Sequence, residues 1–70
     1  MKITLPKPTT PEEAIRAICY LRAWTVRKLA DEIGADESWL SKARKHNRGS
    51  QQLIDRVLEM APEGVTWVDG

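Results

Sequence analysis

Residues 25–46, TVRKLADEIGADESWLSKARKH, predict two short amphipathic helices joined by a tight turn. In the first of the two, which we expect to begin after Thr25, apolar side chains recur at i, i+3, i+4 and i+7. They are Val26, Leu29, Ala30 and Ile33. Gly34 ends this helix, because glycine adopts the positive φ of a helix C-terminus without strain. Asp36 then caps a second helix that continues to about residue 46 or 47.

The turn between these helices is so short that they must cross at a steep angle, which is the geometry of a helix-turn-helix. Ala30 is small enough for the point where the helices meet. In the second helix, at ~100° per residue, Leu40 and Ala43 point back into the core. The opposite face carries Ser38, Ser41, Lys42 and Lys45. Trp39 and His46 lie on one flank of this face, and Glu37 and Arg44 lie on the other.

A third and a fourth helix are expected on either side of this pair. Thr10-Pro11-Glu12-Glu13 is typical of a helix start, and the apolar stripe that follows, with Ile15, Ile18 and Cys19, continues to about residue 22 or 23. Towards the C-terminus, Ser50 can cap another helix, which Pro62 would end. Its apolar positions are Leu53, Ile54, Val57, Leu58 and Ala61.

The two ends of the chain carry short β-type patterns. Residues 1–9 contain two prolines and the alternating segment Lys2–Leu5, which predicts an arm or a brief edge strand. Residues 63–70 include Val65-Thr66-Trp67-Val68, a tail that pairs either with residues 3–5 or with the same segment of a second subunit. We therefore expect one mainly all-α domain over residues 1–70, a compact four-helix unit with possible short terminal β-strands.

Composition limits the classes of protein that this chain can be. Its 70 residues include one cysteine and one histidine, so neither a disulfide framework nor a protein-only zinc site is expected. No apolar run approaches the ~20 residues of a membrane span, and the N-terminus does not resemble a signal peptide. We expect a soluble, cytoplasmic protein. With no nucleophile–base pair and no Gly-rich phosphate loop, we expect neither an enzyme nor a cofactor.

The net charge of +1 conceals a polarised distribution. Residues 37–49 hold four cations against Glu37, whereas residues 50–70 hold only Arg56 against four carboxylates. A basic cluster on one element attracts a polyanion. Serine hydroxyls and lysines can reach base edges in a groove, so Ser38, Ser41, Lys42 and Lys45 are candidate base-reading residues. Candidate DNA-backbone contacts are Thr25, Arg27, Lys28, Arg44, Arg48 and Ser50.

Thr25 to His46 resembles the helix-turn-helix of the phage repressor and Cro-like DNA-binding family. The matching positions are Leu29-Ala30, Ile33-Gly34, Leu40 and Ala43. Members of the family often begin both helices with glutamine, where this chain has Val26 and Glu37. The resemblance implies a homodimer that binds double-stranded DNA in the major groove. Its site would be a pseudo-palindrome with half-sites about one helical turn apart.

We therefore expect a sequence-specific transcriptional regulator, a repressor that acts by occupying an operator. Two alternatives stay open. One is a protein-interaction module, such as an antitoxin or a phage-encoded inhibitor, that works through the acidic segment Asp55–Asp69 and an exposed Trp67. The other is an architectural or excision factor that bends DNA.

Four individual residues also carry expectations. Trp39 either packs on a neighbouring helix or contacts a DNA sugar or a thymine methyl group. Trp24 and Trp67 are expected in the core or in a dimer interface. Cys19 is expected to be a buried thiol.

Overall fold

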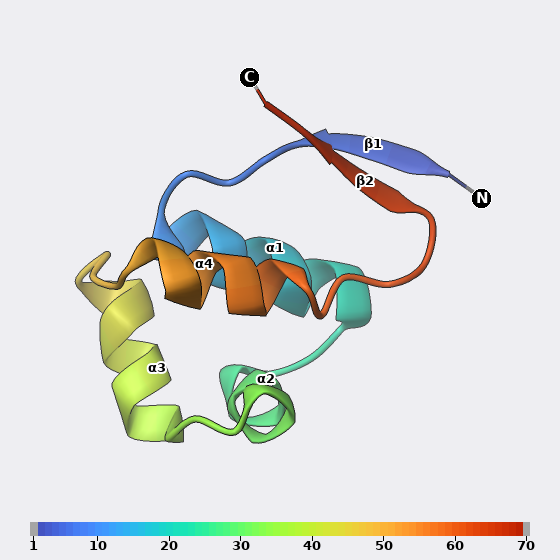
Figure 1. Ribbon diagram of the computed structural model, residues 1–70. Coiled ribbons are helices and arrows are strands. Elements are labelled where there is room, and N and C mark those ends of the chain that lie inside the picture. Colours follow the sequence, from blue (N-terminus) through green and yellow to red (C-terminus); the bar gives the residue numbers. More distant parts are fainter. Residues whose placement is uncertain (1, 70) are drawn as a thin grey trace.

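The computed structural model describes residues 2–69 and has four helices between two short strands (Figure 1). The elements are β1 (Ile3–Pro6), α1 (Pro11–Arg22), α2 (Val26–Ile33), α3 (Glu37–Lys45), α4 (Gln51–Leu58) and β2 (Val65–Val68). The prediction of a mainly α-helical domain with short terminal strands is confirmed. The longest of the described helices has 12 residues, too few to cross a membrane.

Each helix begins at the polar residue that the sequence predicts as its cap. The side-chain oxygen of each cap accepts a hydrogen bond from a backbone N–H of the first turn, which would otherwise lack a partner inside the helix. The four pairs are Thr10 with Glu13 at 3.3 Å, Thr25 with Lys28 at 3.2 Å, Asp36 with Ser38 at 2.7 Å and Ser50 with Leu53 at 3.3 Å. Local sequence signals therefore fix where all four helices start.

The core is built from the apolar stripes of the four helices. Its largest fully buried side chains are Ile15, Ile18, Leu29, Leu40 and Val57. α1 packs against all three other helices, and α2 also packs against α3 and α4. Cys19, expected to be buried, is only half-buried at the edge of this core.

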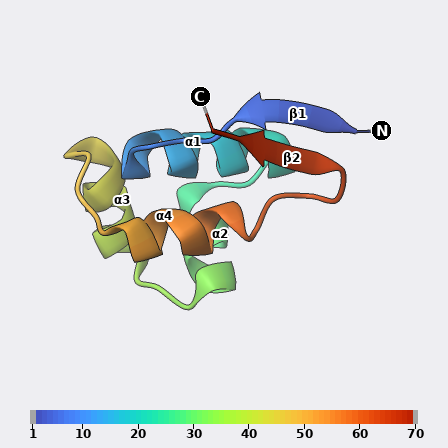
Figure 2. The same ribbon diagram turned by 45° about the horizontal axis from the view of Figure 1, so that its top comes forward.

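The two strands pair with each other in parallel, with Ile3 opposite Val65 and Pro6 opposite Val68. Of the two pairings that the sequence leaves open for the C-terminal segment, the one with residues 3–5 of the same chain is present. The sheet lies across α1 and α4, on the side remote from α3 (Figures 1 and 2). Trp67 is half-buried against the helical core, in keeping with its expected place in the core, and it is not the exposed residue that the protein-interaction alternative invokes.

The end of α4 differs from its prediction. The helix stops at Leu58, one turn before Pro62, and Ala61 lies outside it. The last backbone bonds tighten to three-residue spacing, from Met60 N to Val57 O and from Ala61 N to Leu58 O. A proline ring disfavours the helical conformation of the residue that precedes it. Pro62 therefore affects the turn before it, and the helix ends earlier than the proline itself. Arg22 then holds this turn, its Nε donating to Met60 O at 2.8 Å.

Candidate nucleic-acid interface

The α2–α3 turn is short and is held by local hydrogen bonds together with one from α4. Gly34 has φ 72° and its N–H donates to the last carbonyls of α2, while Ala35 N donates to Ala30 O at 2.8 Å. The Arg56 guanidinium of α4 donates to Ile33 O and so ties the end of α2 to α4. The pair of helices that the sequence predicts is therefore held by the hydrogen bonds of its own turn and by Arg56 of α4.

α3 buries one narrow side and exposes the rest. Leu40 and Ala43 face the core, with at most 5% of their surface accessible. Ser38, Lys42 and Lys45 are exposed on the outer side, as predicted. Ser41 is half-buried and lies towards α1, on the flank of the exposed face rather than on its crest.

The cations of α3 have no carboxylate partner among residues 2–69. The ion pairs in this part of the chain are Glu12–Arg16 and Lys28–Glu32, each at 3.0 Å and each within one helix. The exposed cations of α3 and its following turn are Lys42, Arg44, Lys45 and Arg48. Their positive charge is therefore available to an external anion.

A shallow groove of about 430 Å³ runs between α3 and α1. Its walls are formed by Glu12, Arg16, Ser41, Arg44 and Lys45. Three of these five side chains are cationic and one is a hydroxyl, a composition that suits a phosphate. The three α3 residues were candidates from the sequence, whereas Glu12 and Arg16 were not, because only the packed structure brings α1 beside α3.

The other flank of α3 is aromatic. Trp39 is 51% exposed and stands between two shallow grooves. The first, of about 260 Å³, is also lined by Lys42, His46 and Arg48. The second, of about 170 Å³, reaches α4 at Ser50, Gln52, Leu53 and Arg56. Trp39 thus covers part of the α3–α4 junction and offers the rest of its indole to solvent.

The remaining backbone candidates lie at the starts of α2 and α4. The hydroxyls of Thr25 and Ser50 already cap their helices, although each keeps an O–H to donate. Arg27 is exposed. Lys28 is paired with Glu32, and its Nζ lies 5.9 Å from the centroid of a Trp24 ring, so its charge is partly used within the protein.

The opposite end of the molecule is acidic. A groove of about 390 Å³ between α4 and β2 is lined by Lys7, Asp55, Leu58, Glu59, Trp67 and Asp69. The charge asymmetry of the sequence is therefore also an asymmetry in space. Among residues 2–69 no group of three or more histidine, cysteine or carboxylate side chains is placed to hold a metal ion.

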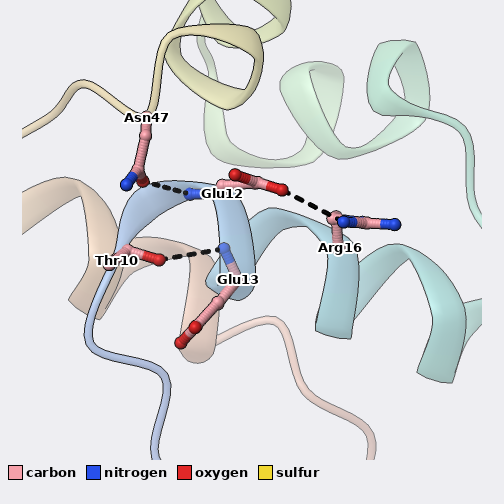
Figure 3. A network of polar contacts seen from close by, with 5 residues as sticks. All are labelled: Thr10, Glu12, Glu13, Arg16 and Asn47. Carbon is pink, nitrogen blue, oxygen red and sulfur yellow. Dashed lines mark hydrogen bonds and ion pairs between the residues drawn. The ribbon is translucent and has the colours of Figure 1, made fainter.

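Two interactions link distant parts of the chain in this region. The Asn47 side chain accepts a hydrogen bond from Glu12 N at 3.3 Å and so fixes the turn after α3 to the start of α1 (Figure 3). Burial raises the pKa of the Cys19 thiol above its ordinary range, and the Arg44 guanidinium opposes part of this shift. Neither interaction has a local sequence signal, since the partners are 35 and 25 residues apart.

Comparisons of this chain with protein families, with curated proteins and with solved structures found no match.

Proposed function

We propose that this protein is a sequence-specific DNA-binding regulator that inserts α3 into the major groove. The observation that carries the proposal is the outer side of α3, where exposed serine and lysine side chains have no carboxylate partner among the described residues. A two-helix unit with a tight turn presents such a helix as a rigid projection. The major groove of DNA is wide enough to admit it.

Within this proposal the α3 side chains divide by their position. Ser38, Lys42 and Lys45 stand outermost and read base edges, with Ser41 beside them on the α1 flank. The backbone contacts surround the helix, as positioning contacts do in DNA complexes. They are Thr25, Arg27, Lys28, Arg44, Arg48 and Ser50.

We further propose that the protein acts in the cytoplasm, on the nucleoid, as a Cro-like repressor that occupies an operator as a homodimer. Two copies related by a two-fold axis would meet a pseudo-palindromic site with half-sites about one helical turn apart. What supports the dimer is that residues 2–69 present one short reading helix, the nine-residue α3, so a second copy would supply the reading helix for the second half-site.

The test is selection of binding sites from random duplex DNA, followed by titration of the selected duplex with Lys42→Ala. Lys2→Ala, which removes the same charge from the other end of the molecule, is the matched control. We expect a palindromic motif, a loss of roughly tenfold in affinity for Lys42→Ala and little change for Lys2→Ala. Recovery of no motif, together with loss of binding near physiological salt, would contradict the proposal.

The acidic groove between α4 and β2 supports a second candidate, a protein-interaction module such as an antitoxin or an inhibitor. That function predicts weak DNA binding even at low salt, so the same titration separates the two.

Among DNA-binding functions, a bend-angle measurement on the selected duplex separates an architectural or excision factor from a repressor. The former kinks its site strongly.

A further inference from the structure

We propose that the α1–α3 groove holds one phosphate of the DNA backbone, with Arg16 as a ligand and Glu12 as the residue that limits affinity. This inference rests on the proposed function. Arg16 and Glu12 belong to α1, outside the helix-turn-helix. They nevertheless line the same groove as Ser41, Arg44 and Lys45 of α3.

Arg16 has the donors that a phosphate requires. Its side chain is 70% exposed, and Nη1 donates to Glu12 Oε1 at 3.0 Å (Figure 3). A guanidinium carries five N–H donors in a planar fork, so the single bond to Glu12 leaves the others for a second anion. The ion pair also orients the arginine before any ligand arrives.

The backbone at the start of α1 does not supply these donors. Glu12 N already donates to Asn47 Oδ1, and Glu13 N donates to Thr10 Oγ1 (Figure 3). Recognition in this groove therefore depends on side chains. The bond to Asn47 keeps α1 close to the turn that follows α3, so the groove is part of the folded domain before binding.

Glu12 has an opposing effect. Its carboxylate lines the groove beside three cations and repels a phosphate that enters it. Glu12 therefore lowers affinity for every duplex, whatever its sequence, because a backbone phosphate carries no sequence information. This matters for a regulator, since excess nonspecific affinity would retain it on unrelated DNA.

The experiment measures affinity for the selected duplex and for an unrelated duplex across a range of salt concentrations. Arg16→Gln is compared with Lys2→Gln, which removes one charge far from α3. Glu12→Gln is compared with Glu13→Gln, because Glu13 lies in the same helical turn, does not line the groove and points away from Arg16 (Figure 3). Thermal melting of each variant confirms that it is folded.

We expect Arg16→Gln to weaken binding to both duplexes by about fivefold and to reduce the salt slope by about 0.9, the value for one phosphate contact. Glu12→Gln should strengthen binding to both by about threefold, and the two control variants should resemble wild type. If wild type binds and Arg16→Gln binds equally well with an unchanged slope, the groove is not a phosphate site. If Glu12→Gln and Glu13→Gln have equal effects, Glu12 has no special role. Absence of wild-type binding to any duplex would overturn the proposed function itself and this inference with it.

Discussion

At the scale of single residues, Gly49 leaves almost no room for a side chain, whereas Gly34 leaves open space. A Cβ atom there would lie 2.6 Å from Leu53 Cδ2 and 3.0 Å from Pro11 Cγ. This close approach brings the turn after α3 against the starts of α1 and α4. The turn itself is predictable from the sequence, but the approach is not, because it depends on Pro11 from a distant part of the chain.

Gly49→Ala should therefore destabilise the protein more than Gly34→Ala. Gly34 has φ 72°, and a Cβ added there would meet no atom within 4 Å, so its substitution costs only the backbone preference, about 1 kcal/mol. Gly49 adds a steric overlap, for which we expect a further ~1–2 kcal/mol. Urea unfolding of both variants measures the difference, and equal losses would show that Leu53 relieves the overlap without cost.

The Cys19 thiol should make stability depend on pH in the alkaline range. Burial raises its folded-state pKa, so its contribution is fully present below the unfolded pKa of about 8.5 and is lost as pH rises through the folded value. The difference in free energy of unfolding between wild type and Cys19→Ala should therefore shrink between about pH 7 and pH 10. An unchanged difference in urea unfolding at the two pH values would be inconsistent with a raised pKa.

At the scale of elements, the starts of all four helices could be predicted, because a cap and its partner lie within three residues of each other. The side chains that join one element to another could not. Arg22 donates to Met60 O, and Arg56 donates to Ile33 O, across separations of 38 and 23 residues. The sequence does not show which carbonyl either arginine will meet, and only the packed structure gives them partners.

Arg56→Ala should loosen the link between α4 and the end of α2. Removing its hydrogen bond to Ile33 O leaves a helix C-terminal carbonyl without its charged donor, which we expect to cost about 1–2 kcal/mol of stability. Arg27→Ala, which removes an exposed arginine from α2, is the control and should change stability by less than about 0.5 kcal/mol. Thermal melting compares the two, and similar melting temperatures would refute a stabilising role for Arg56.

At the scale of the whole molecule, the two kinds of charge are separated in space. The basic α3 lies at one end, and the sheet with its acidic groove lies at the other (Figure 2). The sequence predicted the charge polarity, and it offered the pairing of the chain ends as one of two alternatives. It did not predict that the strands run in parallel. Strand direction depends on where α4 and the turn at Gly64 deliver the chain, and this is a property of the folded domain.

The two tryptophans at opposite ends of the molecule should respond differently to substitution. Trp67 packs from β2 against the helical core, so Trp67→Ala should cost about 2–4 kcal/mol of stability. Trp39 is half-exposed on the flank of α3, and Trp39→Ala should cost about 1 kcal/mol. Under the proposed DNA-binding function its exposed indole contacts a sugar or a thymine methyl group, so the same variant should also bind DNA more weakly. Unfolding and DNA titration of both variants measure these effects. The reverse order of stabilities would show that the sheet is not docked on the core.

The DNA-binding surface that we propose consists of α3 and its flanks, and an amide ¹H–¹⁵N NMR titration of the protein with its selected duplex would map it residue by residue. We expect shifts concentrated in residues 37–48 and at the starts of α1, α2 and α4, with the sheet and the acidic groove unchanged. Shifts confined to α4 and β2, or no shifts even at low salt, would contradict the proposal.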